Sequence, residues 1–174
     1  MLIRKAAEED IDAIEKIYDE CLTLEEEGKL TVGWKRGIYP TRGVAEDAVR
    51  RGDMFVQESE PGKIVGTAII NRIQVDCYAQ GNWSYSASDD EVMVLHTLII
   101  SGRSEGNGFG SAFVEFYENY AKEQGCAYLR LDTNEINAAA RSFYKKFGYT
   151  EIGIVPTVFN GIEGVNLVLL EKKI

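Results

Sequence analysis

The fold is decided by the stretch VMVLHTLIISGRSEGNGFGSAFVEFYENYAKEQGCAYLRLD, residues 92 to 132. Its first nine residues, Val92 to Ile100, form the most apolar segment of the chain and predict a buried central strand. Aromatic residues then recur at helical spacing from Phe109 to Tyr120, and Gly125 ends this helix. Ala127 to Asp132 predicts a further strand. The stretch therefore predicts a strand, a crossover helix and a second strand.

The segments on either side predict further strands and helices around this unit. Before it we expect a strand at Leu2–Lys5, an amphipathic helix carrying Ile11 to Leu22, an ordered loop at Glu25–Thr41, a short helix at Val44–Val49 closed by Gly52, and a hairpin of Met54–Glu58 and Ile64–Asn71. After it we expect a helix between Asn137 and Gly148, and a closing hairpin of Ile152–Thr157 and Val165–Glu171 around Gly161 and Gly164.

Composition limits the class of protein. The chain has 174 residues, 45% of them hydrophobic, so we expect a single domain over residues 1–174. The 28 acidic residues outnumber the 19 basic ones, and the formal net charge of -9 opposes binding to nucleic acid or anionic lipid. No run approaches the roughly 20 apolar residues of a membrane span, so we expect a cytoplasmic protein. Cys21, Cys77 and Cys126 form no CxxC pair, which argues against a zinc site.

The glycine turn at residues 106–110, GNGFG, lies between the long strand and the helix. Without Cβ atoms its backbone N–H groups can approach an anion, and the helix amino terminus adds favourable dipole charge. A P-loop would need GxxxxGK[ST], but the lysine nearby is Lys122, inside the helix. A dinucleotide fingerprint fits Phe109, Gly110 and Ser111 poorly, although Asp132 stands where its ribose-binding acid is expected. The turn predicts a phosphate site, with the dinucleotide as the weaker alternative.

Two motifs together resemble one family. EGNGFG, residues 105–110, resembles the R/QxxGxG/A acetyl-CoA loop of the GNAT superfamily of N-acetyltransferases, and LDTNEINAAARSFYKKFGY, residues 131–149, resembles its NxxAxxFYxKxGF segment. The predicted order of elements is also that of the family. The resemblance implies an α/β (α+β) fold with a mixed, mostly antiparallel sheet of about seven strands and flanking helices. It also implies transfer of the acetyl group of acetyl-CoA to a primary amine by direct attack.

The resemblance assigns cofactor-binding residues. The pantetheine arm would pair with the backbone of the long strand, and the diphosphate would lie on the glycine turn. The implied residues are Leu98, Ile99, Ile100, Arg103, Glu105, Gly106, Asn107, Gly108, Phe109, Gly110, Ser111, Asn137 and Tyr144. Glu105 stands at the position where the family's loop usually has Arg or Gln. Because a carboxylate facing a diphosphate is unfavourable, we expect Glu105 to point away, with Arg103 as a candidate replacement.

Tyr144 and Asn137 each have a second explanation. Tyr144 corresponds to the family tyrosine that donates a proton to the departing thiolate, but it also lies on an apolar helical stripe, where a core tyrosine is expected. Asn137 corresponds to the family asparagine that contacts the cofactor, and it is also a sufficient helix N-cap.

The acceptor amine must lose a proton before it attacks, because such an amine is almost wholly protonated at pH 7. His96, the only histidine, lies in the long strand and is the candidate base, although a single histidine in an apolar strand is more often structural. Asp89, Asp90 and Glu91 precede the same strand and are a weaker alternative, since three adjacent acids usually face solvent.

Aromatic residues are candidates for the acceptor site. Trp34, Tyr39, Trp83 and Tyr85 occupy the regions that line the acceptor groove in the family, and aromatic faces suit an ammonium group or an apolar acceptor. The sequence leaves the acceptor open between a small-molecule amine and a peptide amine, and it leaves open whether the protein is a homodimer. A non-catalytic acyl-CoA or metabolite sensor, and a nicotinamide oxidoreductase that uses Asp132 on a ribose, are the alternative functions.

Overall fold

The structure, a computed structural model, describes residues 1–104 and 106–174, with the backbone alone at Arg103. Its helices are α1 (Ile11–Glu26), α2 (Arg42–Arg51), α3 (Phe109–Glu123) and α4 (Ala138–Lys146). Its strands are β1 (Leu2–Lys5), β2 (Met54–Glu60), β3 (Lys63–Asn71), β4 (Val92–Ile100), β5 (Tyr128–Asn134), β6 (Thr150–Phe159) and β7 (Ile162–Lys173). In these described ranges no helix is both long and apolar enough to cross a membrane.

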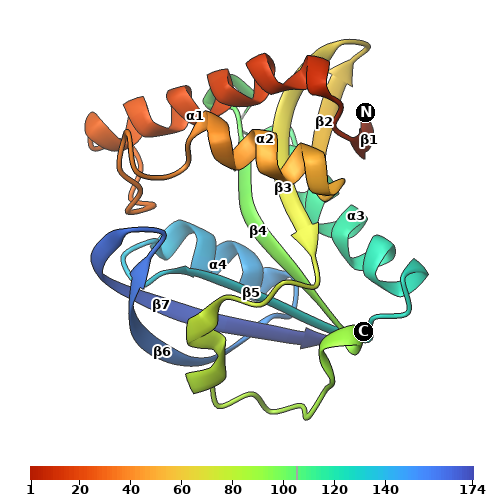
Figure 1. The fold of residues 1–174 in the computed structure, drawn as a ribbon, viewed down its shortest axis with the longest axis vertical. Coiled ribbons are helices and arrows are strands. Elements are labelled where there is room, and N and C mark those ends of the chain that lie inside the picture. The colour runs from red at the N-terminus through yellow and green to blue at the C-terminus, as the bar shows by residue number, and fades with distance from the viewer. Residues whose placement is uncertain (105) are drawn as a thin grey trace.

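The strands form one sheet in the order β1-β2-β3-β4-β5-β7-β6 (Figure 1). β4 and β5 are parallel, and the other five neighbouring pairs are antiparallel. The parallel pair is joined by the crossover through α3, because parallel strands cannot be joined by a tight turn. The predicted mixed, mostly antiparallel sheet with flanking helices is therefore confirmed.

β4 and β5 separate part of the way along their length. Their register runs from Val92 opposite Tyr128 to Leu95 opposite Leu131, and no further pair joins the described parts of the two strands. Figure 1 shows β4 continuing beside β3 toward α1 and α2 while β5 runs away from it with β7. Beyond Leu95, the β4 edge that faced β5 has no strand partner for its backbone groups. We call this opening the fork.

β4 also bends at the fork. Two of its residues, Thr97 and Leu98, lie across from the single β3 residue Ala68, which is the arrangement of a β-bulge. Thr97 has a φ of 52°, a left-handed conformation that is unusual for a β-branched residue. The bend therefore turns the free edge of β4 at the point where β5 leaves it.

Helices pack on both faces of the sheet. α1 and α2 pack on one face and α3 and α4 on the other, because successive strand residues point to opposite faces. Strand residues buried toward α1 and α2 are Met54, Val56, Ile69 and Ile99, and those buried toward α3 and α4 include Phe55, Ala68, Ile70, Met93 and Leu95. A third cluster lies between the C-terminal strands and the segment 72–91 that joins β3 to β4.

Several boundaries differ from the sequence prediction by a few residues, and three of the differences have a clear physical cause. α1 continues to Glu26, because its last turn is mostly polar, with Leu24 as its one apolar residue, and periodicity does not show where it ends. β5 continues to Asn134, because it stays paired with β7 after it has left β4. The closing hairpin turns at Asn160 and Gly161, both of which have positive φ, and Gly164 lies inside β7 instead of in the turn.

Candidate active site

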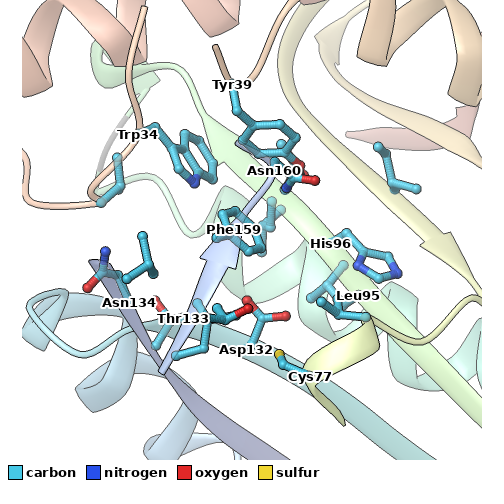
Figure 2. Close-up of a pocket in the computed structure, with 18 of the residues that line it drawn as sticks. Trp34, Tyr39, Cys77, Leu95, His96, Asp132, Thr133, Asn134, Phe159 and Asn160 are labelled. Carbon is cyan, nitrogen blue, oxygen red and sulfur yellow. Dashed lines mark hydrogen bonds between the residues drawn. The ribbon is translucent and has the colours of Figure 1, made fainter. Parts of the chain in front are cut away.

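A cavity of about 530 Å³ opens at the fork. Its walls come from the chain between α1 and α2, the segment after β3, the β6–β7 turn, and the ends of β4 and β5 (Figure 2). Amide, hydroxyl and carboxylate groups are placed among aromatic and aliphatic side chains. A concave site with a few polar groups among apolar ones is the usual form of a small-molecule site.

A second cavity, of about 190 Å³, adjoins the first. It follows β4 from Leu98 to Gly102, and the C-terminal half of α1 forms its opposite wall. Val32, Trp34 and Leu98 line both cavities, so the two meet at these side chains. Together the two adjoining cavities extend from the chain that leads into the glycine turn to the other side of the fork, and we call the pair the passage.

Three aspartates line the larger cavity, Asp47, Asp76 and Asp132, and Asp132 lies where β4 and β5 separate. It lies on β5 directly after the last residue paired with β4, and Figure 2 shows its carboxylate facing the cavity. Its Oδ2 accepts a 2.7 Å hydrogen bond from the Tyr78 hydroxyl. Burial raises the pKa of Asp132 to about 6, and the bond from Tyr78 opposes that rise. Within the part of the chain that the structure describes, no ion pair involves Asp132, so this carboxylate has no counter-charge there.

Tyr144 reaches the same cavity from α4. The residue is 8% exposed, and its ring packs edge-on against that of Tyr149 at a centroid distance of 5.7 Å. Burial raises the pKa of Tyr144 above its usual value, and the charge of Asp132 adds to the rise. Tyr144 is therefore held protonated. Asn137 lines the cavity and also caps α4, because its Oδ1 accepts the Ala140 N–H at 3.1 Å.

His96 lines the larger cavity from β4, but its ring belongs to a hydrogen-bonded network. Its Nε2 lies 3.1 Å from Oδ1 of Asn71, whose amide group donates to Asp53 at 2.9 Å. Asp53 also accepts from Nε of Arg51 at 2.8 Å. Burial lowers the pKa of His96 to about 4, so the ring is uncharged at neutral pH and weakly basic.

The segment between α1 and α2, residues 27–41, crosses the fork, and we call it the strap. The carboxylate of Glu25 fixes it by accepting the backbone N–H groups of Val32 at 2.7 Å and Gly33 at 2.8 Å. Gly33 has a φ of 78° and approaches Asn134 of β5 so closely that a Cβ there would lie 2.1 Å from the amide nitrogen. The strap therefore reaches from α1 to β5 and closes one side of the passage.

Trp34 and Tyr39, two of the predicted acceptor residues, lie on the strap and line the larger cavity. The Tyr39 ring stands edge-on to Trp34 at 5.7 Å and to Phe159 of β6 at 5.4 Å. Figure 2 shows these three rings gathered on the side of the cavity that the strap and the β6–β7 turn form. Phe159 is a member of this wall that was not identified from the sequence.

Trp83 and Tyr85, the other two predicted acceptor residues, line neither cavity. The guanidinium of Arg130 lies 4.0 Å from the centre of the Trp83 ring, and Trp83 Nε1 donates to the Tyr78 carbonyl at 2.8 Å. Tyr85 is 39% exposed. Trp83 therefore helps to hold the segment 72–91, and with it Tyr78, against the sheet.

The three acids before β4 lie outside both cavities. Asp89, Asp90 and Glu91 form a short 3-10 turn, and Glu91 accepts the Ser88 N–H at 3.0 Å and its hydroxyl at 2.7 Å. These contacts give Glu91 a local capping role. Across the described ranges, no three histidine, cysteine, aspartate or glutamate side chains come together as metal ligands.

The glycine turn leads into the free amino end of α3. Gly106 and Gly108 have φ of 79° and 76°, and a Cβ at either position would meet no atom within 4 Å. Backbone conformation and not lack of space therefore requires glycine there. Among the described residues no side chain caps α3 at Gly108, so the first N–H groups of this 15-residue helix are available to an anion.

The rest of the turn is held by the protein itself. Asn107 Nδ2 donates to the Ser104 carbonyl at 3.2 Å, and Gln57 of β2 donates to the Phe109 carbonyl at 3.1 Å. Glu105 and the side chain of Arg103 lie outside the described residues, so the expectations for both stay predictions.

Asp132 and Tyr78 form the part of the site that sequence reasoning missed. Asp132 was considered only as a ribose partner, and its hydrogen-bond partner lies 54 residues earlier in a turn-rich segment. No spacing rule links two such positions. The available signal was weak: Asp132 ends a predicted buried strand just before a functional motif.

Comparison with known proteins shows what this chain is similar to. Residues 11–149 match the sequence model of the Acetyltransferase (GNAT) family. An uncharacterized N-acetyltransferase of Methanocaldococcus jannaschii is 25% identical over 175 residues, which cover 99% of this chain and 92% of that protein. The streptothricin acetyltransferase of Streptomyces lavendulae is 26% identical over 116 residues, which cover 67% of this chain and 53% of that protein.

The fold is similar to a solved structure as well. A GNAT-family acetyltransferase from Streptococcus agalactiae superposes with a TM-score of 0.80 at 24% identity, over 99% of this chain and 95% of the other. That likeness concerns the fold. The family match contains both the glycine turn and the segment from residue 131 to residue 149. The chain therefore belongs to the GNAT family of N-acetyltransferases.

Proposed function

We propose that this protein transfers the acetyl group of acetyl-CoA to a primary amine by direct attack of the amine on the thioester. Membership of the family supports acyl transfer from acetyl-CoA. The passage through the fork supports direct attack, because donor and acceptor can enter from opposite ends and meet inside it. This passage is the observation that carries the proposal.

The donor would enter at the end next to the glycine turn. Its diphosphate would bind the open N–H groups at the start of α3, with Gly106, Asn107, Gly108, Phe109, Gly110 and Ser111 around it. Its pantetheine arm would pair with the unpaired backbone edge of Leu98, Ile99 and Ile100, next to the smaller cavity, with Asn137 nearby. Arg103 would approach the diphosphate, and Glu105 would point away from it.

The acceptor would occupy the larger cavity. Asp132 offers an uncompensated carboxylate, for which an ammonium group is the natural partner. Trp34 and Tyr39 would contact the rest of the acceptor, and aromatic rings tolerate both a cation and an apolar group. The acceptor is a small-molecule amine or a peptide amine that can place its ammonium group beside Asp132.

Asp132 would take the first proton from the acceptor. The neutral amine nitrogen then forms a bond to the thioester carbon, and the carbon–sulfur bond breaks. Tyr144 gives its phenolic proton to the departing thiolate and regains a proton from the new amide nitrogen. One proton thus leaves on the CoA thiol, and one leaves to solvent from Asp132.

His96, the base predicted from the sequence, competes with Asp132 for this role. The pKa of His96 is about 4 and that of Asp132 is about 6, so His96 is the weaker base. It therefore accepts a proton from an ammonium group less readily than Asp132 does. Its Nε2 also has a partner in Asn71. Under this proposal His96→Gln keeps most activity, whereas Asp132→Asn loses it.

Two measurements test the proposed function together. Calorimetry with acetyl-CoA should give saturable binding, and a thiol-release assay over polyamines, amino acids, an aminoglycoside and a peptide with a free amino terminus should detect turnover of at least one amine. Binding without release of thiol from any amine would support the alternative of an acyl-CoA sensor. Absence of acetyl-CoA binding would overturn both.

A further inference from the structure

The bend of β4 at Thr97 lies at the centre of the passage. Thr97 and Leu98 line the larger cavity, and Leu98 also lines the smaller one. Here β4 has already lost its pairing with β5, and the bulge against Ala68 disturbs its pairing with β3. The backbone at Thr97 and Leu98 is therefore less constrained by the sheet than the rest of the strand.

The conformation of Thr97 needs outside support. A β-branched residue with a φ of 52° is in a sparsely populated region, and such conformations persist where the surroundings impose them. The Thr97 hydroxyl supplies a contact of this kind, since its Oγ1 is hydrogen-bonded to the hydroxyl of Tyr39 on the strap.

Tyr39 is itself held firmly. It is 7% exposed, and its ring is fixed edge-on between Trp34 and Phe159. Its backbone N–H and carbonyl both bond to Lys35, which closes the tip of the strap. Arg36, the residue after Lys35, donates from its Nε to Oε1 of Glu26 on α1 at 2.9 Å, and this bond fixes the tip of the strap to the helix. The Tyr39 hydroxyl is therefore held in a fixed position.

We propose that Tyr39 is a positioning residue: by holding Thr97, its hydroxyl sets the β4 bend and aims the backbone N–H groups of Thr97 and Leu98 at the thioester carbonyl. This inference rests on the proposed function, because it needs a donor that lies along β4. Oxygen charge develops on that carbonyl as the amine attacks, so misdirected N–H donors reduce the rate of the chemical step and leave donor binding nearly unchanged.

Tyr39 also lines the larger cavity, so a contact between its hydroxyl and the acceptor is the competing explanation, whereas the ring contact proposed above is kept in Tyr39→Phe. A lost acceptor contact raises the KM of the amine. If the substitution instead displaces the bend of β4, kcat falls and both KM values stay near those of the wild type. The two explanations also differ at Thr97, because an acceptor contact by Tyr39 does not depend on the Thr97 hydroxyl.

The kinetic test compares Tyr39→Phe with Thr97→Val and with the double variant. Each single variant should lower kcat about 10- to 100-fold with both KM values within about twofold, and the double variant should be no worse than either, because all remove one interaction. Thr97→Ser, which keeps the hydroxyl, should restore kcat. The matched control is Tyr18→Phe, at a buried tyrosine whose hydroxyl has no hydrogen-bond partner among the described residues and which lines neither cavity; its kcat should equal that of the wild type.

A spectroscopic measurement does not require the acceptor to be known. The carbonyl resonance of bound [1-¹³C]acetyl-CoA should lie downfield of the free value, and Tyr39→Phe should reverse part of this displacement while Tyr18→Phe does not. Additive losses in the double variant, or a carbonyl resonance that Tyr39→Phe leaves in place, would overturn the proposal and leave the proposed function intact.

If acetyl-CoA does not bind at all, the proposed function fails, and amide resonances of the free protein still decide whether Tyr39 sets the bend. Those of Thr97 and Leu98 should move in Tyr39→Phe and not in Tyr18→Phe. Unchanged amide resonances would overturn the positioning role independently of turnover.

Discussion

The two ends of the passage are built in different ways. At the proposed donor end, the main-chain groups offered to the ligand are continuous in the chain, since the β4 edge, the glycine turn and the first turn of α3 follow each other from Leu98 to Ser111, while α1 and the strap form the opposite wall. The acceptor end is assembled from the strap, the segment after β3, the end of β5, α4 and the β6–β7 turn. Under the proposed function, a ligand that recurs across the family would be bound mainly by one local motif, whereas the acceptor site would depend on distant segments.

The chemistry of the two ends also differs. The donor end offers backbone N–H groups at a helix amino terminus, which suits an anion and needs no particular side chain. The acceptor end offers a carboxylate without a counter-charge, which suits a cation. Variants at one end should therefore leave the function of the other nearly intact, and each prediction below tests this separation.

The largest effect is expected from Asp132→Asn. Asparagine keeps the shape and can still accept from Tyr78, but it cannot hold the ammonium group by charge or take its proton. We expect kcat/KM for the amine to fall about 1,000-fold, with the dissociation constant of acetyl-CoA unchanged. The wild-type rate should rise with pH through about 6 as the carboxylate loses its proton, and the variant should lack this step.

Glu135→Gln is the matched control for Asp132→Asn. It removes one negative charge three residues further along, at an exposed position that lines neither cavity. Its kinetics should equal those of the wild type. An Asp132→Asn enzyme that keeps the pH step near 6, or that loses acetyl-CoA binding, would contradict the separation of the two ends.

A smaller loss is expected from Tyr144→Phe. The variant keeps the buried ring but removes the proton donor, so kcat should fall about 100-fold while calorimetry finds the affinity for acetyl-CoA unchanged. The loss is smaller than at Asp132, because a thiolate leaves more readily without help than an ammonium group attacks. Turnover at the wild-type rate would remove Tyr144 from the acid role.

At the donor end, Gly108→Ala should weaken acetyl-CoA binding and spare the chemical step. An alanine at a φ of 76° is strained by about 1 kcal/mol, so the free turn relaxes and binding must restore the strained conformation; we therefore expect a five- to tenfold higher dissociation constant. Gly28→Ala is the control, since Gly28 has a φ of 70° in open space away from both cavities. Equal effects of the two variants on binding would show that stability, and not the diphosphate site, is responsible.

The contrast between the two ends of the passage also explains which features of the fold and of the site could be predicted from the sequence. The order of elements and β4 from Val92 to Ile100 followed from periodicity and glycine positions, which are local properties, whereas the single mixed sheet of seven strands was implied by the family resemblance. The cavity around Trp34 and Tyr39 was expected only from resemblance, and Trp83 proved to support the sheet instead. Phe159 reaches the cavity by a chain reversal at the β6–β7 turn that brings distant residues together, and short-range patterns do not encode such meetings.

The smallest and most specific effect is expected from Tyr78→Phe. The Tyr78 hydroxyl donates to the charged form of Asp132 and so holds the pKa of the carboxyl below the value that burial alone would give. Its loss raises the pKa further, so the acid limb of the pH–rate profile should move upward by about one pH unit. Activity then falls severalfold at pH 6 and stays unchanged at pH 8, where the carboxylate is ionised in both proteins.

The ring of residue 78 still packs against Trp83 in this variant, as the two rings do at a centroid distance of 5.1 Å in the wild type. A loss of activity that is equal at all pH values would instead indicate that the segment 72–91 is displaced. A limb that moves to lower pH would exclude Asp132 as the titrating group.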